Sequence, residues 1–279
     1  MLNDEHLKVL LYDPDSSKIF PGQDIKGGVA ITYHDENVKF GAIKQFIYFD
    51  ELRAILQKVE SVKEKSFSEI IYASESYRFT EKLHQDIPKA EKLLSKGHKY
   101  DLKTSVLKTL DGIAFMTEAL ESTESVSVIG LVDGRRSEKW IKKDYIIGPD
   151  NFTTYKVFVP KANGSGALGE VLSTPLIGQP LIGHTQSFIS IGKFANEADA
   201  QACLKYVKSK FARAMLGILK ITQDNPASKW KYVPLQDFTS DSDIDWYKSV
   251  ADIDRQLYAK YGLTQDEIDF IETHVKEME

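Results

Sequence analysis

One glycine-rich segment limits the folds open to this chain more than any other feature. Residues 163–170 read NGSGALGE and contain a G-x-G-x-x-G string just after the strand-like segment TYKVFVPK. In a dinucleotide-binding fold, such a string begins a helix whose N-terminus meets the cofactor phosphates. Here Pro175 and Pro180 prevent a crossover helix of useful length, and the acidic residue expected about 20 positions on is missing. The sequence therefore argues against a doubly wound, cofactor-binding fold.

The N-terminal segment predicts two strands without a complete sheet. HLKVLLYD and GGVAITYH are rich in apolar and β-branched residues, and a polar connector, DSSKIFPGQD, separates them. Two paired strands alone are marginal in water. We therefore expect residues 1–48 to form a hairpin that belongs to a larger sheet, and the remainder of that sheet is not recognisable in the sequence.

The middle of the chain predicts short helices followed by antiparallel strands. The apolar spacing is helical over residues 50–110, with a capping box formed by Ser66 and Glu69. Strands are predicted for SVSVIGLVDG, SEKWIKKDYI, TYKVFVPK and HTQSFISIG, and Asp133-Gly134 predicts a tight hairpin turn between the first two. This mixture indicates an α+β fold.

The last third of the chain predicts long amphipathic helices. Apolar residues recur at helical spacing from Asn196, the expected N-cap, to Leu219. Cys203 falls on the apolar face, which favours a buried and inert thiol. Residues 241–279 predict an acidic helical tail, with a capping box from Thr264 to Glu267.

Charge is distributed unevenly. Residues 224–279 contain 13 Asp/Glu and 6 Lys/Arg, whereas residues 1–223 contain 30 Lys/Arg and 28 Asp/Glu, although the whole chain has a net charge of -5. Residues 135–161 hold 7 basic and 3 acidic residues, and residues 205–220 hold 5 basic and no acidic ones. Such asymmetry is compatible with an anionic partner, although solvated helix faces are often basic as well.

No catalytic or metal-binding motif is visible. The histidines form no pair at metal-like spacing on one helix, and the single cysteine excludes a cysteine zinc site within one chain. Neither a P-loop nor G-x-S-x-G occurs. The chain has no apolar stretch of the ~20 residues that span a bilayer, and its acidic N-terminus is unlike a signal peptide. We therefore expect a cytoplasmic protein without a membrane partner.

Four segments carry a resemblance to a known family: LKVLLYDPDSSKIFPGQDIKGGVAITYHD, YKVFVPKANGSGALGEVLSTPLIG, FISIGKFANEADAQACLKYVKSKFARAMLGILKITQDN and KWKYVPLQDF. They look like the C-terminal half of bacterial restriction–modification N6-adenine DNA methyltransferases. Type II enzymes with a fused or partner endonuclease resemble the chain most. The resemblance runs over essentially the whole sequence, including the ending LYAKYGLTQDEIDFIETHVKEME.

The resemblance implies a domain organisation and a partner. Residues 1–48 would be the C-terminal hairpin of a methyltransferase sheet, 49–240 the target recognition domain that binds double-stranded DNA, and 241–279 an acidic helical tail. Both the S-adenosylmethionine site and the catalytic motif of the family lie upstream of the matched region. We therefore expect no cofactor-binding or catalytic residue in this chain, and S-adenosylmethionine only in the complete enzyme. A methyltransferase catalytic domain or subunit is the expected partner, alongside an endonuclease domain or subunit where the system has one.

Residue type and loop position, not the family, suggest which side chains contact DNA. Lys and Arg pair with phosphates, whereas Arg, Asn and Gln also recognise base edges. The predicted phosphate contacts are Lys139, Lys142, Lys143, Lys161 and Lys210. The predicted base-edge contacts are Arg135, Arg136, Asn163, Thr185 and Gln186.

Two other functions stay open on the sequence alone. The chain could be a subunit of a split methyltransferase or of a restriction endonuclease that is active only with a partner. It could also be a fragment with a purely structural or protein-binding role. Likewise, NGSGALGE is either a loop that lets the backbone approach a DNA phosphate closely or an ordinary connection.

Overall fold

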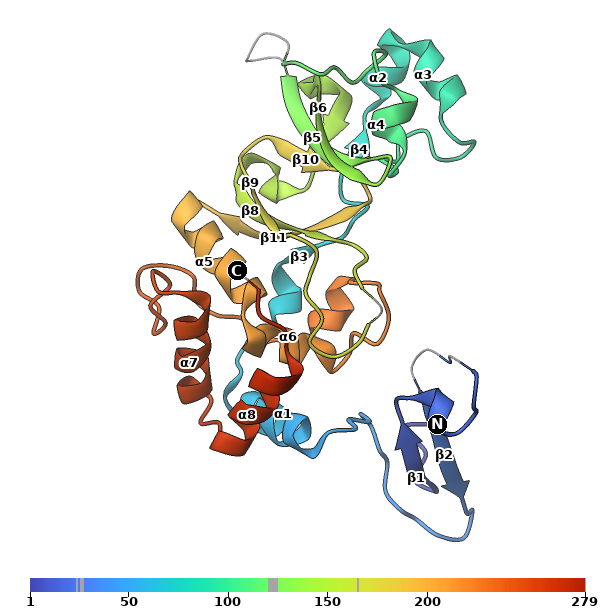
Figure 1. The fold of residues 1–279 in the computed structure, drawn as a ribbon. Coiled ribbons are helices and arrows are strands. Elements are labelled where there is room, and N and C mark those ends of the chain that lie inside the picture. Colours follow the sequence, from blue (N-terminus) through green and yellow to red (C-terminus); the bar gives the residue numbers. More distant parts are fainter. Residues whose placement is uncertain (24, 26–27, 120–124, 165, 279) are drawn as a thin grey trace.

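The computed structural model describes residues 1–23, 25, 28–119, 125–164 and 166–278, which form three parts along an elongated chain (Figure 1). The chain combines helices with antiparallel and mixed sheets, so the α+β prediction is confirmed. We name the three parts the N-terminal hairpin (residues 1–48), the ribbon lobe (77–147 with 182–184) and the helical lobe (49–72, 155–178 and 188–278).

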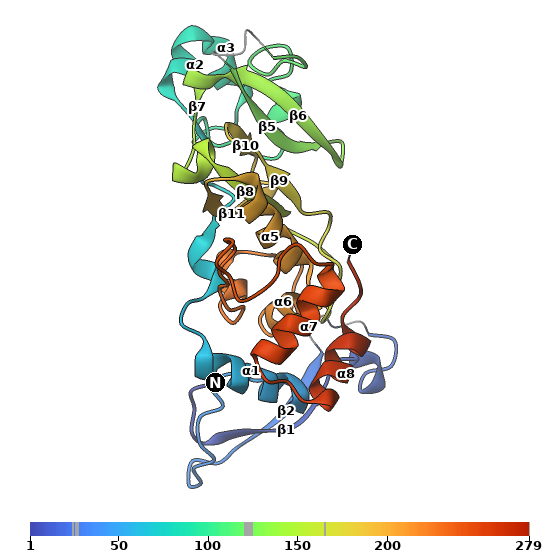
Figure 2. The same cartoon turned by 90° about the vertical axis from the view of Figure 1, so that its left-hand side faces the viewer.

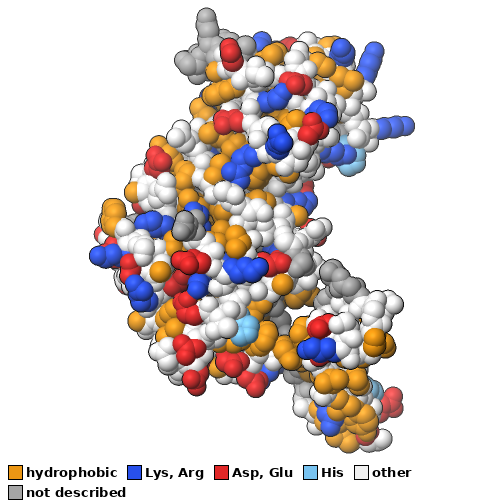
Figure 3. All heavy atoms as spheres, viewed as in Figure 1, with side chains coloured by type: hydrophobic (Ala, Val, Ile, Leu, Met, Phe, Trp, Pro, Cys, Tyr) orange, Lys and Arg blue, Asp and Glu red, His pale blue; other side chains and the backbone are white. Residues whose placement is uncertain are grey.

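The N-terminal hairpin consists of the two predicted strands. β1 (Leu7–Asp13) pairs antiparallel with β2 (Val29–His34), and no other described strand extends this sheet. Its apolar side chains remain open to solvent: Leu10 is 58% and Ile31 46% exposed. Figure 3 shows hydrophobic side chains gathered on this part of the molecule. The hairpin therefore lacks the cover that its apolar residues require.

A long two-stranded ribbon dominates the ribbon lobe. β5 (Ser125–Val132) and β6 (Arg135–Lys142) pair in an unbroken antiparallel register, and β10 (Ile182–His184) adds to β5 in parallel. At the turn, Asp133 and Gly134 have φ values of 49° and 76°. These left-handed conformations are those of a type I′ turn, as the Asp-Gly pair predicts. In Figure 2 the paired strands run diagonally across the lobe.

Short helices pack against this ribbon. Pro88 is the first residue of α3, where its missing N–H costs no helical hydrogen bond, so the predicted helical region is interrupted there. Leu83, Leu107 and Phe115 are fully buried in the core between helices and ribbon. The other elements of this lobe are β4 (Arg78–Phe79), α2 (Glu81–Asp86), α3 (Pro88–Leu93), α4 (Val106–Thr109) and β7 (Ile146–Ile147).

The helical lobe is built on an antiparallel sheet of β3 (Ile71–Tyr72), β11 (Phe188–Phe194), β8 (Tyr155–Pro160) and β9 (Leu176–Gly178), in that order. β8 and β11 confirm two predicted strands. The predicted capping box of Ser66 and Glu69 also forms, but it opens only a 3₁₀ turn (Phe67–Ile70). The chain then enters β3, because pairing with β11 overrides the local helical pattern.

Five helices of the described chain surround one large core in this lobe: α1 (Asp50–Val62), α5 (Glu197–Lys208), α6 (Lys210–Gly217), α7 (Val250–Lys260) and α8 (Gln265–His274). Trp230, Tyr206 and Phe211 are fully buried at its centre. Cys203 is also fully buried, as predicted, and burial raises the pKa of its thiol well above the usual value.

The predicted helix from Asn196 to Leu219 is broken at Ser209. Asn196 caps α5 as expected, but Ser209 has an extended ψ of 147° and caps α6 through its side chain. The carboxylate of Asp254 in α7 also accepts the backbone N–H groups of Lys210 and Phe211, both at 2.9 Å. These acceptors satisfy the first donors of α6, so the chain begins a new helix there.

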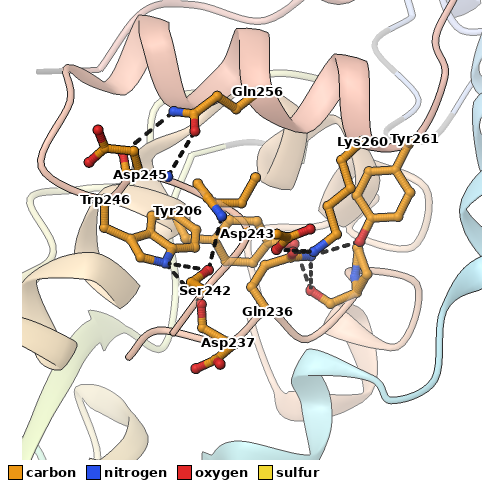
Figure 4. A network of polar contacts seen from close by, with 12 residues as sticks. Tyr206, Gln236, Asp237, Ser242, Asp243, Asp245, Trp246, Gln256, Lys260 and Tyr261 are labelled. Carbon is orange, nitrogen blue, oxygen red and sulfur yellow. Dashed lines mark hydrogen bonds and ion pairs between the residues drawn. The ribbon is translucent and has the colours of Figure 1, made fainter. Parts of the chain in front are cut away.

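The acidic C-terminal segment is part of the main core. Ile253, Leu257 and Ile271 are fully buried among residues of the preceding helices. A polar network fastens the acidic loop before α7 (Figure 4): Lys260 donates to Gln236 at 2.9 Å and pairs with Asp243 at 2.8 Å. The predicted boundary at residue 240 therefore separates no independent core.

Candidate nucleic-acid interface

An open groove lies between the turn of the ribbon and the segment that leads into α4. Its volume is about 610 Å³. Three contacts hold its walls together: the backbone N–H of Gln186 donates to the carbonyl of Leu102, Ser187 donates to Thr104, and Lys108 pairs with Asp133. The lining residues are Lys103, Thr104, Ser105, Lys108, Thr109, Leu131, Val132, Asp133, Gly134 and Gln186.

Two lysines with few internal partners, Lys103 and Lys108, line this groove, and Arg135 directly follows its lining residue Gly134. Lys103 and Arg135 make no ion pair within the part of the chain that the structure describes. Lys108 pairs with Asp133 at 2.6 Å, but both side chains are largely exposed, at 65% and 71%. Since an exposed pair of this kind contributes little stability, Lys108 can exchange Asp133 for another anion at small cost.

The two predicted arginines lie on opposite faces of the ribbon, because side chains alternate along a strand. Arg135 shares its face with Lys139, which pairs with Asp111 beside α4. Arg136 is on the other face, where its guanidinium donates to the carbonyl of Thr174 at 2.6 Å. Arg136 also lies 5.8 Å from the ring centre of Phe188. Arg135 is thus free to reach a ligand, whereas Arg136 is held in place.

Gln186 and Lys161 lie near the same region. Gln186 lines the groove and is half-buried. Lys161 follows β8, and its backbone N–H donates to the carbonyl of Ser187 at 2.9 Å. Its ammonium group pairs with Glu75 at 3.1 Å in an exposed position. Of the two side chains, that of Gln186 lines the groove, whereas the ammonium group of Lys161 is directed to Glu75.

Three of the predicted contact residues, Lys139, Asn163 and Thr185, have buried side chains in the structure. Lys139 is 9% exposed and paired with Asp111. Asn163 is 6% exposed; its amide donates to the carbonyl of Val171 at 2.7 Å and its side-chain oxygen accepts from Ser173. Thr185 is fully buried against Gly130 of β5. Asn163 and Thr185 therefore present little polar surface, and the ammonium group of Lys139 is already paired with the half-exposed Asp111.

The other predicted lysines lie away from the groove. Lys142 and Lys143 are exposed at the opposite end of β6 from Arg135, about 23 Å away for a strand rise of about 3.3 Å per residue. Lys210 belongs to the helical lobe, where it pairs with Glu272 and retains only 18% side-chain exposure. The ten predicted side chains therefore do not form one surface.

The groove also contains residues that the site prediction omitted. Lys103, Thr104 and Ser105 form one wall and Lys108 lies one helical turn further on. The residue types gave a general signal, since Lys, Thr and Ser side chains are among those that contact phosphates. Nothing in the local pattern indicated that the turn at Asp133 would lie opposite this segment.

A second set of cations is buried in the helical lobe and at its junction with the ribbon lobe. The ammonium group of Lys156 donates to the carbonyls of Phe152, Thr154 and Gln179 at 3.0–3.1 Å, and no part of the residue is exposed. Burial lowers the pKa of Lys156 to about 7. Nearby, burial also lowers the pKa of His184 to about 4, which keeps this ring neutral. These groups connect chain segments and do not face a ligand.

The NGSGALGE segment is held by two more buried cations. Lys220 donates to the carbonyl of Asn163 at 2.9 Å, and Arg213 donates to the carbonyls of Gly169 and Glu170 at 3.5 and 3.4 Å. A Cβ on Gly166 would lie 2.4 Å from the backbone of Ile221. Gly166 and Gly169 therefore allow close approach to the chain's own backbone, whereas Gly164 lies against the side chain of Glu170. Ser165 lies outside the described residues.

Other kinds of site have no support in the described residues. No group of three or more His, Cys, Asp or Glu side chains in this part of the chain could hold a metal ion. None of its helices combines the length and the apolar character needed to cross a membrane. The groove of the ribbon lobe is a candidate ligand-binding surface.

Neither the comparison with protein-family models nor the comparison with curated proteins found a match for this chain.

Proposed function

We propose that this chain is the DNA-sequence-recognition portion of a restriction–modification adenine-N6 DNA methyltransferase, and that double-stranded DNA binds at the groove of the ribbon lobe. One observation carries the proposal. Lys103 and Lys108 line the groove, Arg135 directly follows its lining residue Gly134, and none of the three has a buried acidic partner in the described chain. Positive side chains that are not neutralised internally are those that can replace the counterions of a DNA backbone.

The shape of the lobe is compatible with duplex DNA. A two-stranded β-ribbon fits the major groove of B-DNA, which is about 12 Å wide. The ribbon of β5 and β6 carries Arg135 beside its turn, and Gln186 lines the adjacent groove. Lysines at the rim would fix the position of the duplex, and the arginine and glutamine side chains would contact base edges.

The exposed apolar side chains of the N-terminal hairpin support the proposal that this chain has a catalytic partner. Ala30 and Ile31 are adjacent on β2, where the pairing with β1 is regular, so they face opposite sides of the strand, and both are exposed. Leu10 and Leu11 of β1 are also 58% and 47% exposed. Apolar residues on both faces are typical of strands inside a covered sheet. A cytoplasmic catalytic domain or subunit that binds S-adenosylmethionine would supply this cover. In the alternative, this chain is a subunit of a split methyltransferase or of a restriction endonuclease. Its hairpin would then also need a partner subunit to cover it.

The proposal is tested by the salt dependence of DNA binding. Fluorescence anisotropy with a duplex pool of randomised sequence should show binding that weakens steeply as salt rises. The K103A/K108A variant should bind more weakly, and the slope of log K against log salt should fall by about 1.8, since each lost phosphate contact removes about 0.9. Salt-independent binding, or no binding, would contradict the proposal.

A charge-matched variant controls for net charge. Lys89 and Lys92 on α3 are exposed, belong to the same lobe and make no ion pair within the described chain. The K89A/K92A variant should retain the affinity of the unmodified chain. An equal loss in both variants would show that the groove has no special role.

The missing cofactor site is tested separately. Isothermal titration of the chain with S-adenosylmethionine should give no heat of binding, because the proposal assigns the cofactor to the catalytic partner. Measurable binding would instead favour an enzyme whose cofactor site lies in this chain.

A further inference from the structure

The turn of the ribbon places a carboxylate among the cations of the groove. Asp133 is 71% exposed and contacts Lys108 at 2.6 Å. Its backbone is left-handed, with φ of 49°. The geometry of the turn therefore fixes the position from which the side chain of Asp133 projects. A Cβ on the neighbouring Gly134 would meet no atom within 4 Å, so the turn is not covered by the described chain.

A carboxylate at this position is unfavourable for binding phosphate alone. Asp133 would repel the DNA backbone and would also compete with it for Lys108. An ionised carboxylate can only accept hydrogen bonds. In the major groove the groups that donate are the amino groups of cytosine and adenine, and Asp or Glu typically accepts from cytosine N4. Asp133 is therefore suited to a base edge and not to the backbone.

Arg135 complements this acceptor. It lies two residues further along the same tight turn, and it makes no ion pair in the described chain that would hold it back. Its guanidinium has paired donors that match O6 and N7 of guanine, the commonest specific contact between proteins and DNA. Guanine and cytosine form one base pair. At the ribbon turn, Arg135 can donate to the guanine of such a pair and Asp133 can accept from its cytosine.

We propose that the turn of the ribbon recognises a G·C base pair in the major groove, with Arg135 donating to guanine and Asp133 accepting from the amino group of cytosine. Lys108 leaves Asp133 in the complex and contacts a phosphate. This inference rests on the proposed function, because it names the base pair that the same surface selects.

The test is selection of binding sites from a randomised duplex pool by the unmodified chain and by two variants. D133N keeps a residue that tolerates the left-handed conformation. Asparagine both donates and accepts, which matches N6 and N7 of adenine, so one position of the selected site should change from C·G to A·T. Its affinity for unselected duplex should rise, because a repulsive charge is removed. R135A should lose the preference for G·C at that same position.

The expected size of the effect is a loss of about 10- to 100-fold in discrimination at one base pair, which is the range for a good side-chain contact to a base. D144N is the matched control, because Asp144 is an exposed acid at the far end of the ribbon. Its selected site should be unchanged.

The outcomes separate the two proposals. Binding that depends on Lys103 and Lys108, with an unchanged selected site in D133N and R135A, would overturn the inference and leave the proposed function standing. Changes at two unrelated positions would also overturn recognition of a single base pair. Absence of DNA binding by the unmodified chain would overturn both.

Discussion

The ribbon lobe and the helical lobe both contain runs of basic residues, but they use them in opposite ways. In the ribbon lobe, Arg135 is exposed and Lys103 is half-buried, and neither makes an ion pair in the described chain. In the helical lobe, Arg213 is 2% and Lys220 6% exposed, and both donate to backbone carbonyls. The same residue types thus carry surface charge in one lobe, whereas in the other they are buried and donate hydrogen bonds to backbone carbonyls.

The basic run at residues 205–220 shows why this difference matters. Without its structure, the run looks like the better anion-binding surface, since it contains no acidic residue. In the structure, Lys205 donates to the carbonyls of Trp246 and Lys248, and Lys210 pairs with Glu272. An anion can bind where cations are still available for a ligand. The number of basic residues in a segment of the sequence does not decide this.

Removing an internal cation should have the largest effect. In R213M, the carbonyls of Lys208, Gly169, Glu170 and Lys276 lose their donor inside the protein. We expect the free energy of unfolding to fall by about 3 kcal/mol, the cost of leaving buried polar groups unsatisfied. Urea denaturation followed by circular dichroism measures this change.

Arg255 provides the control for this substitution. It belongs to α7 in the same lobe, but its side chain is 70% exposed and, among the described residues, forms an ion pair only with Asp252. R255M should change the free energy of unfolding by less than about 1 kcal/mol. If R213M and R255M lower the free energy of unfolding equally, the distinction between internal and surface cations is wrong.

Lys156 should reveal its burial through pH. Its pKa is lowered to about 7, so above pH 7 the unfolded state binds more protons at this residue than the folded state does. Its contribution to stability therefore rises with pH, by about 2 kcal/mol between pH 7 and pH 9. The measurement is the difference in free energy of unfolding between the unmodified chain and K156M across this range. A difference that does not vary with pH would mean that the ammonium group is solvated.

The ion pair between Lys210 and Glu272 should have a smaller effect. It joins α6 to α8, but Glu272 keeps 44% side-chain exposure. We expect K210A to lower the free energy of unfolding by about 0.5 kcal/mol, and less at high salt. Thermal unfolding at low and at high salt checks this. A loss comparable to that of R213M would place Lys210 with the internal cations.

The smallest effect on stability is expected at the groove. Lys103 lacks an ion pair in the described chain, and Lys108 has only an exposed one. K103A/K108A should therefore change the free energy of unfolding by less than about 0.5 kcal/mol while it weakens DNA binding. A large loss of stability would indicate that these lysines, like Arg213, are structural.

Local features of the fold were predictable because short-range chemistry specifies them. The turn at Asp133-Gly134 forms because these residues accept left-handed backbone conformations. The caps at Asn196 and Thr264 form because their side chains reach backbone donors three residues on. The interruption at Pro88 follows from its missing N–H.

The candidate site was only partly predictable. Arg135 and Gln186 were identified from residue type, and both lie at or beside the groove. Lys103 and Lys108 were missed, because the groove exists only where residues 103–109 meet the ribbon turn and residue 186. Asn163 has the residue type of a base-edge contact, but neighbouring carbonyl and hydroxyl groups use its amide internally.

The sequence by itself determined the elements of this protein: its strands, its hairpin turn, its helix caps and its uneven charge. Only the tertiary structure decided which cations remain exposed, and where the long helical pattern breaks. Ser209 ends α5 because Asp254, far along the chain, supplies acceptors for the next helix. Exposure and hydrogen-bond satisfaction depend on residues brought together from distant segments, and the type of a single residue does not contain that information.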